Sequence, residues 1–186
     1  MIDLSVIIPV YNEANTLREI IDRILAVMIP RESVTLKHNS EGSKEFVVLE
    51  IVLVDDGSTD SSPGILSELK ANEQISDQFA GFTILRQKNG GKGAALKAGI
   101  EAARGEIVLF QDADLEYDPQ DYATMIKPIM SQEVDVVIGS RFLKDQILFV
   151  NKWNIIYLRN HIGIRLINLL TNVLYWFNAT DYEGCY

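Results

Sequence analysis

Apolar residues follow two kinds of pattern along the chain. Five short runs are almost continuously apolar, which is typical of strands in a parallel sheet that is covered on both faces. These runs span residues 4–10, 46–54, 82–85, 107–110 and 134–138. The segments between most of them carry helical signals. The pattern therefore predicts strands that alternate with helices.

The first helical signal follows the run at residues 4–10. Its apolar positions recur at the spacing of one helix face, and they are Leu17, Ile20, Ile21, Ile24 and Leu25. Thr16 and Glu19 have the spacing of a capping box, so the helix is expected to begin there. Residues 30–44 are polar and are expected to form a surface loop.

Three further helices are predicted from caps and composition. Pro63 suits the first turn of a helix that Ser61 or Ser62 would cap. Residues 94–104 are rich in alanine and are followed by Gly105, a residue that favours a helix end. Pro119 begins a helix over residues 120–132, which Pro128 is expected to kink or shorten.

Alternating strands and helices with short connections predict right-handed crossovers and a Rossmann-like, doubly wound, mostly parallel α/β sheet. Ligands of such sheets bind outside the carboxyl ends of the strands. Polar clusters follow the predicted strands at those ends, at residues 11–13, 55–60, 88–92, 112–116 and 140–141. Five clusters at one edge indicate a binding site there.

Residues 153–177 differ from the rest of the chain. They are strongly apolar and helical in pattern, with Arg159, His161 and Arg165 inserted. Two interpretations remain open: helices that pack in a core or a homodimer, and amphipathic helices that lie on a membrane or accept a lipid chain. We therefore expect one domain over residues 1–150 and a helical acceptor-facing or membrane-facing segment of it over residues 151–186.

Composition narrows the class of protein. The chain has 186 residues, of which 47% are hydrophobic and 23% are charged, as expected for a globular domain. A net charge of −9 argues against a nucleic-acid partner bound mainly through its phosphates. The lone Cys185 allows no intrachain disulfide, and no signal-peptide or membrane-span pattern occurs. These features predict a cytoplasmic protein.

Three carboxylates follow the run at residues 107–110. Asp112, Asp114 and Glu116 are spaced two apart, so they point the same way if the extended geometry persists. Hard divalent ions such as Mg²⁺ or Mn²⁺ prefer such ligands and often also bind substrate phosphates. The segment predicts a metal–diphosphate site. An acidic surface turn is the alternative.

Two common nucleotide-binding loops are absent from the sequence. No Gly-x-Gly-x-x-Gly follows the first predicted strand, which argues against a dinucleotide-binding site. The segment 89–94, Asn-Gly-Gly-Lys-Gly-Ala, lacks the spacing and the hydroxyl residue of a Walker A loop. Lys92 would still bring a cation to a helix N-terminus, near phosphates.

Four motifs together resemble glycosyltransferase family 2. They are Leu-Ser-Val-Ile-Ile-Pro-Val-Tyr-Asn-Glu at residues 4–13, Ile-Val-Leu-Val-Asp-Asp-Gly-Ser-Thr-Asp at residues 51–60, Asn-Gly-Gly-Lys-Gly at residues 89–93, and Gln-Asp-Ala-Asp at residues 111–114. Two later segments, 139–142 and 180–186, resemble the branch that acts on dolichyl or other polyprenyl phosphates. Related chains continue with a basic residue beyond the position of Tyr186, so the sequence is expected to stop within a motif.

The resemblance implies a GT-A fold and a nucleotide-sugar donor of the GDP-mannose or UDP-glucose type. It places the donor against Pro9, Tyr11, Glu13, Val54, Asp55, Asp56, Lys92, Asp112 and Ala113. It implies Mg²⁺ or Mn²⁺ at Asp112, Asp114 and Glu116, held chiefly by Asp114. The acceptor phosphate would meet Arg141 and Arg159, and the catalytic set would be Asp112, Asp114, Arg141 and Asp181.

The resemblance also implies an inverting hexosyltransferase that acts on a dolichyl or undecaprenyl phosphate at the cytoplasmic face of a membrane. A phosphate nucleophile is largely ionised at neutral pH and needs no strong general base. A polysaccharide or cell-surface sugar hydroxyl is the alternative acceptor, and it would need a base such as Asp181 or Glu183. A non-catalytic nucleotide-sugar-binding or membrane-scaffold protein is the alternative of another class.

Overall fold

The computed structural model describes residues 2–34, 45–72, 79–139 and 165–174. The chain divides into two compact units, Met1–Asp135 and Val136–Tyr186. The first unit contains a sheet with helices on its faces. The described part of the second unit contains one helix, over residues 165–174.

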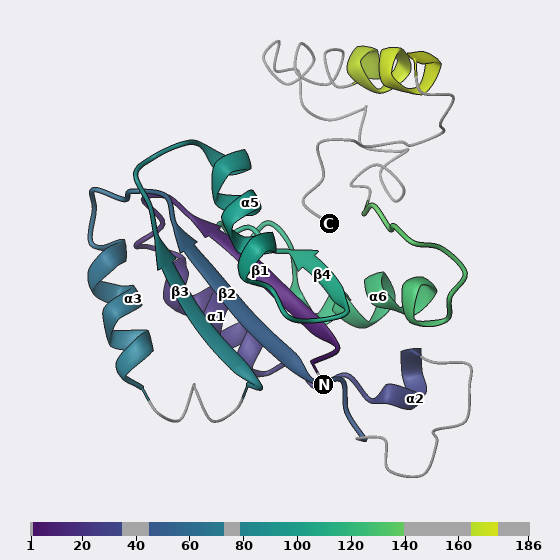
Figure 1. Ribbon diagram of the computed structural model, residues 1–186, viewed down its shortest axis with the longest axis horizontal. Coiled ribbons are helices and arrows are strands. Elements are labelled where there is room, and N and C mark those ends of the chain that lie inside the picture. Colours follow the sequence, from purple (N-terminus) through teal and green to yellow (C-terminus); the bar gives the residue numbers. More distant parts are fainter. Residues whose placement is uncertain (1, 35–44, 73–78, 140–164, 175–186) are drawn as a thin grey trace, which may run out of the picture. The chain divides into compact units, whose positions relative to one another are not determined.

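The sheet of the first unit has four parallel strands in the order β3-β2-β1-β4 (Figure 1). They are β1 (Leu4–Val10), β2 (Leu49–Asp55), β3 (Gly81–Arg86) and β4 (Ile107–Phe110). Val10 pairs with Asp55, so β1 and β2 end at the same level, while Ile7 pairs with Phe110. The order reverses between β1 and β4, which is where a doubly wound sheet opens a crevice at its carboxyl edge.

Helices cover both faces of this sheet, as the continuous apolar strands predict. They are α1 (Leu17–Leu25), α2 (Arg31–Val34), α3 (Ser62–Ala71), α5 (Lys92–Ala102) and α6 (Tyr122–Met130), with the 3₁₀ turn η1 (Pro119–Asp121) before α6. In Figure 1, α5 lies in front of the sheet and α1 lies behind it. The crossover from β3 to β4 therefore runs over the opposite face from the one after β1.

Close packing under α5 explains two glycines. Ile7, Val52, Val54 and Ala95 form a fully buried cluster between the sheet and α5. A Cβ at Gly99 of α5 would lie 2.3 Å from Cγ2 of Ile7, so only glycine lets the helix approach so closely. A Cβ at Gly105 would similarly lie 2.7 Å from the backbone N of Ser5. The two glycines thus allow α5 and the segment before β4 to approach β1 closely.

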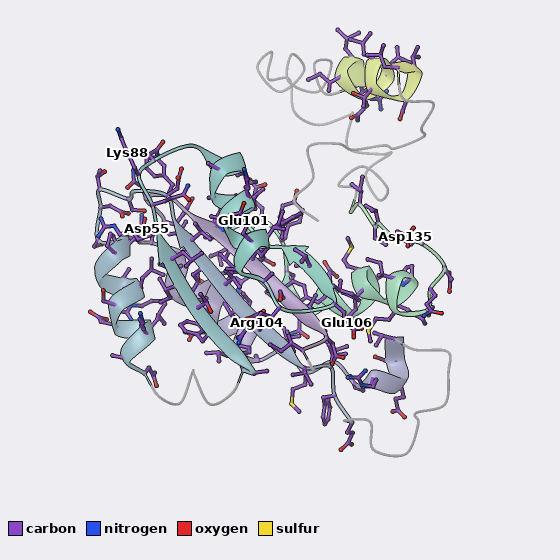
Figure 2. The ribbon with its side chains drawn as sticks, in the orientation of Figure 1. Asp55, Lys88, Glu101, Arg104, Glu106 and Asp135 are labelled. Atoms are coloured by element: carbon purple, nitrogen blue, oxygen red, sulfur yellow. The ribbon has the colours of Figure 1, made fainter. Side chains whose placement is uncertain are left out.

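A hydrogen-bonded network lies around the buried Glu50 at the amino end of the sheet. Glu50 is fully buried, and its carboxylate accepts hydrogen bonds from the Ser5 hydroxyl at 2.6 Å and from the Arg104 backbone N–H and Nε at 2.8 and 2.7 Å. Burial pushes the pKa of Glu50 upward. The hydrogen bonds from Ser5 and Arg104, together with the positive charge of Arg104, outweigh burial and hold the pKa below its ordinary value of 4.5. Figure 2 shows Arg104 at this end of the sheet, away from Asp55 and Lys88.

Three local predictions are wrong. Residues 134–138 form no strand, and the side chain of Val136 is 72% exposed. An apolar run forms a strand only where a neighbour offers backbone partners, and the four-stranded sheet does not extend to this segment. The capping box is not formed, because the Thr16 hydroxyl donates to the Glu13 side chain instead, at 3.1 Å. Residues 31–34 of the expected loop form α2.

The helix over residues 165–174 exposes a broad apolar surface. It confirms part of the helical prediction for residues 153–177. Its exposed apolar side chains are Leu166, Ile167, Leu169, Leu170, Val173 and Leu174. Within the described ranges, no helix has both the length and the hydropathy that crossing a membrane requires.

Candidate functional site

The loop after β1 is bound to the loop after β2 by side chain to backbone hydrogen bonds. Asn12, in a left-handed conformation with φ of 59°, accepts from the Thr59 N–H at 2.8 Å through its side-chain oxygen. The Asn12 N–H donates to the Ser58 hydroxyl at 3.0 Å, and the Glu13 N–H donates to the Ser62 hydroxyl at 3.0 Å. These bonds fix the backbone of residues 11–13 at the carboxyl edge of the sheet.

Asp55 is buried at the end of β2 and organises its own loop. One carboxylate oxygen accepts from the Ser58 N–H at 2.8 Å, and the other lies 3.2 Å from Nε of Arg86. Its side chain is almost inaccessible, whereas that of Arg86 is largely exposed. Oδ2 of Asp55 accepts no hydrogen bond from the described residues, so this oxygen can still accept one from a ligand that reaches the edge beside Arg86. Arg86, which the sequence analysis did not single out, presents a guanidinium at the same edge.

Asp56 binds the loop before α5. Its carboxylate accepts from the Gln87 side-chain amide at 2.6 Å and from the backbone N–H groups of Gly90 and Gly91 at 2.9 and 2.8 Å. Burial pushes the pKa of Asp56 upward, but these three donors outweigh it and hold the pKa below its ordinary value of 3.8. Asp56 thus stays ionised and fixes the position at which α5 begins.

The ammonium group of Lys92 contacts the carboxylate of Asp112. Lys92 is the first residue of α5, and its Nζ lies 2.8 Å from each of the two Asp112 carboxylate oxygens. Half of the Lys92 side chain is exposed, and Asp112 is mostly covered. The structure therefore brings together two residues that are 20 positions apart and that the sequence predicted for one site.

The other two predicted metal ligands are exposed on the loop after β4. Asp114 accepts from the Glu116 N–H at 3.0 Å, and Leu115 between them has φ of 67°. Across the described part of the chain, no three His, Cys, Asp or Glu side chains are grouped to hold a metal ion. Asp112, Asp114 and Glu116 therefore do not form such a group in this structure. The carboxylate oxygens of Asp112 and Asp114 still fit a hard divalent ion if a ligand supplies further oxygens.

Gln111 is a residue of the site to which the sequence analysis gave no role. It is fully buried, its amide donates to the backbone oxygen of Asp112 at 2.9 Å, and its Oε1 accepts from the Tyr122 hydroxyl at 2.8 Å. It thereby links the acidic loop to α6. The signal available in the sequence was a polar residue directly after an apolar strand, but its partners could not be inferred.

The remaining predicted residues differ in their exposure. Pro9, Tyr11 and Glu13 lie at the carboxyl edge, where the Tyr11 side chain is 49% exposed. Val54 is fully buried in the cluster under α5, and Ala113 is also buried, so a ligand reaches at most their backbone. Arg141, Arg159 and Asp181 lie outside the described residues.

The arrangement is one of polar loops at the carboxyl edge of a parallel sheet, with a lysine and two aspartates at the β1/β4 switch point. A family model described as glycosyl transferase family 2 matches residues 5–185. The chain belongs to this family. The match spans nearly the whole sequence and confirms the resemblance seen in its motifs.

Curated relatives share the sequence over much of its length. The chain is 31% identical over 170 residues to a dodecaprenyl-phosphate galacturonate synthase of Rhizobium johnstonii. This alignment covers 89% of the chain and 45% of the relative. It is 36% identical over 134 residues to an undecaprenyl-phosphate 4-deoxy-4-formamido-L-arabinose transferase of Pseudomonas syringae pv. syringae, which covers 72% of the chain and 34% of the relative. The chain thus spans less than half the length of these relatives.

A solved structure supports the fold. The mannosyltransferase PcManGT from Pyrobaculum calidifontis, in complex with GDP-Man and Mn²⁺, superposes with a TM-score of 0.50 at 29% sequence identity. The superposition covers 67% of this chain and 31% of that protein. The α/β fold of this family member is therefore GT-A-like, as its sequence predicted.

Proposed function

We propose that the chain is the donor-binding part of a metal-dependent glycosyltransferase that moves a sugar from a nucleotide sugar to a polyprenyl phosphate. The observation that carries the proposal is the contact between Lys92 and Asp112 at the carboxyl edge, beside Asp114. The printed names of the curated relatives support a polyprenyl-phosphate acceptor. The Mn²⁺ complex of the superposed mannosyltransferase supports the metal.

In this proposal, Asp112 and Asp114 hold Mg²⁺ or Mn²⁺. When bound, the ion stabilises the negative charge that develops on the nucleoside diphosphate as the bond to the sugar breaks. The third predicted ligand, Glu116, contributes only if the loop after β4 rearranges. Lys92 adds a positive charge at the same place, and its first-turn position on α5 puts it near an electropositive helix end.

The nucleoside would lie along the rim formed by the loops after β1 and β2. Tyr11 has the exposed ring that can pack on a base, and Pro9 and Glu13 flank it at the edge. Asp56 acts mainly through the loop that it fixes, because its buried carboxylate already accepts three hydrogen bonds. Oδ2 of Asp55 accepts none from the described residues and is the proposed acceptor for a base or ribose donor. Arg86 is the additional cationic group at this rim.

The acceptor side of the proposal concerns residues outside the described ranges. Arg141 and Arg159 would bind the lipid phosphate, since guanidinium groups bind phosphate in a bidentate manner. With a second pKa of about 6, the phosphate is mostly ionised at neutral pH and attacks without a strong base. Asp181 is then expected to order the acceptor loop or assist catalysis.

We further propose peripheral contact with the cytoplasmic face of a membrane. The exposed apolar surface of the helix over residues 165–174 supports this contact, because it resembles the apolar side of interfacial helices. Self-association through this surface is the competing use. The donor is proposed to be a nucleotide-activated hexose or hexose derivative.

Transfer of a labelled sugar tests the function. The protein is incubated with Mn²⁺, undecaprenyl phosphate and a donor panel of GDP-mannose, UDP-glucose and UDP-galacturonate. The proposal expects a labelled lipid to form with one donor, and no labelled lipid to form when EDTA is present from the start. A label that reaches a soluble glycan and never the lipid would contradict the proposed acceptor.

A further inference from the structure

The Lys92 ammonium group contacts the Asp112 carboxylate, which is also a proposed metal ligand. Its ammonium group lies 2.8 Å from both carboxylate oxygens of Asp112, which is the distance of a direct charge-assisted hydrogen bond. A divalent ion that binds Asp112 while Lys92 stays in place would lie close to the ammonium charge, and the two cations would repel each other. The two cations therefore compete for a single carboxylate.

The position of Lys92 is not explained by the stability of α5. A positive charge in the first turn of a helix opposes the helix dipole, and the first turn of α5 has no acidic residue. Its neighbour Lys97, in contrast, lies 4.0 Å from Glu101 in an ordinary i,i+4 pair on the exposed surface of the same helix. Lys92 thus lies where it disfavours the isolated helix and favours a bound anion.

Lys92 is also able to move. About half of its side chain is exposed, and a lysine ammonium is a point charge on a flexible four-carbon chain. The backbone beneath it is fixed, because Asp56 accepts from the N–H groups of Gly90 and Gly91 directly before α5. Rotation of the lysine side chain can therefore change its contacts without movement of the helix backbone.

We propose that Lys92 is a placeholder cation that makes metal binding and diphosphate binding depend on each other. In the free protein it neutralises Asp112 and disfavours a lone metal ion. When a nucleoside diphosphate arrives, Lys92 leaves Asp112 for the diphosphate, and the carboxylate becomes available as a ligand. This inference rests on the proposed function, because it assumes that the metal and the diphosphate share this site.

The physical consequence is a coupling between the two ligands. A nucleoside diphosphate should raise Mn²⁺ affinity, and Mn²⁺ should raise diphosphate affinity by the same factor. Part of this factor comes from the direct contact between metal and phosphate. The part that Lys92 supplies is the release of a competing positive charge, and it disappears if the charge is removed.

The test measures free Mn²⁺ by electron paramagnetic resonance, with and without GDP or UDP, for the wild type and Lys92→Met. Methionine keeps a similar length and removes the charge. We expect Lys92→Met to bind Mn²⁺ about tenfold more tightly in the absence of nucleotide, since a unit charge near a divalent ion has an effect of this order at a partly exposed site. We expect nucleotide to raise its Mn²⁺ affinity by a smaller factor than in the wild type.

Two further variants locate the effect. Lys97→Met removes a lysine from the same helix and should leave Mn²⁺ affinity within about twofold, because a distant exposed charge is largely screened. Asp112→Asn in the Lys92→Met background should abolish the gain. Far-ultraviolet circular dichroism of each variant confirms that the fold is retained.

The outcomes distinguish the inference from the function on which it rests. If nucleotide binding is Mn²⁺-dependent in the wild type but Lys92→Met binds Mn²⁺ alone no more tightly, the placeholder role is wrong and the proposed site stands. If Mn²⁺ strengthens nucleotide binding in none of the proteins, the placeholder role and the proposed metal–diphosphate site are both wrong. A gain in Lys97→Met equal to that in Lys92→Met would also overturn the role, because it would show a general charge effect.

Discussion

The Tyr122 hydroxyl donates a 2.8 Å hydrogen bond to Oε1 of Gln111, and both side chains are fully buried. Through this bond the first residue of α6 holds the residue that follows β4. The Gln111 amide in turn donates to the backbone oxygen of Asp112. The loop that carries Asp112 and Asp114 is therefore supported by the fully buried side chain of Gln111.

Tyr122→Phe should destabilise the protein by about 1–3 kcal/mol, because it removes a hydrogen bond between two buried side chains. Urea denaturation measures the change in the free energy of unfolding. Tyr11→Phe is the matched control: the ring of Tyr11 is half exposed, so the same change there should cost less than about 0.5 kcal/mol. Equal losses in the two variants would show that the Gln111 contact contributes nothing.

Gly57→Ala should destabilise the fold and loosen the loops of the site. Gly57 has φ of 75°, and a Cβ there would lie 2.8 Å from the backbone N of Asn89. The strain and the clash with backbone together should cost about 1–3 kcal/mol. Gly64→Ala is the control within α3, where a Cβ meets nothing within 4 Å and alanine should stabilise by about 0.4–1 kcal/mol. Thermal unfolding of both variants should therefore shift in opposite directions.

Acid should remove stability that Glu50 and Asp56 supply. The folded-state pKa of each carboxyl lies below its ordinary value, 4.5 for Glu50 and 3.8 for Asp56, so each favours the folded state above that value. This contribution is lost as pH falls through the ordinary value and on through the lower folded-state pKa. Denaturant unfolding from pH 7 to pH 3 should show a smaller pH dependence in Glu50→Gln than in the wild type. An unchanged dependence would show that Glu50 is not the group being protonated.

The apolar helix over residues 165–174 should bind lipid. Co-sedimentation with vesicles that contain anionic lipid is expected for the wild type and should fall at least about threefold in Leu170→Asp, because a charge on the apolar surface is costly to bury in the interface. Ile100→Asp introduces the same charge at an exposed apolar position of α5 and is the control. Loss of vesicle binding in both variants would indicate a net-charge effect and not a docking surface.

The sequence predicted the sheet well because each strand carries its own signal. Both β1 and β4 have the predicted bounds, and β2 and α5 differ by a few residues at their ends. The strand predicted over residues 134–138 is wrong, because an apolar pattern does not show whether a neighbouring strand is present to pair with it. The capping box predicted at Thr16 is wrong, because the Thr16 hydroxyl donates to Glu13, a competing local acceptor.

The sequence indicated the edge at which polar residues gather, but it did not predict which contacts they make. Motif spacing placed Asp56, Lys92 and Asp112 at one edge, and the structure confirms that Lys92 and Asp112 meet. The bonds from Asp56 to Gly90 and Gly91 join residues more than 30 positions apart, and no local pattern encodes such a contact. Asp55 and Asp56 therefore make loop-ordering bonds that the sequence did not predict, and their role in donor binding stays a prediction.

The most direct measurement is the calorimetric affinity of GDP and UDP with and without Mn²⁺, in the wild type and in Asp114→Ala. The metal–diphosphate site predicts that Mn²⁺ strengthens binding of one nucleotide by at least about tenfold in the wild type and not in the variant. Asp135→Ala, at an exposed carboxylate outside the site (Figure 2), should behave as the wild type. Equal, metal-independent binding in the wild type and Asp114→Ala would contradict a metal–diphosphate site at this loop.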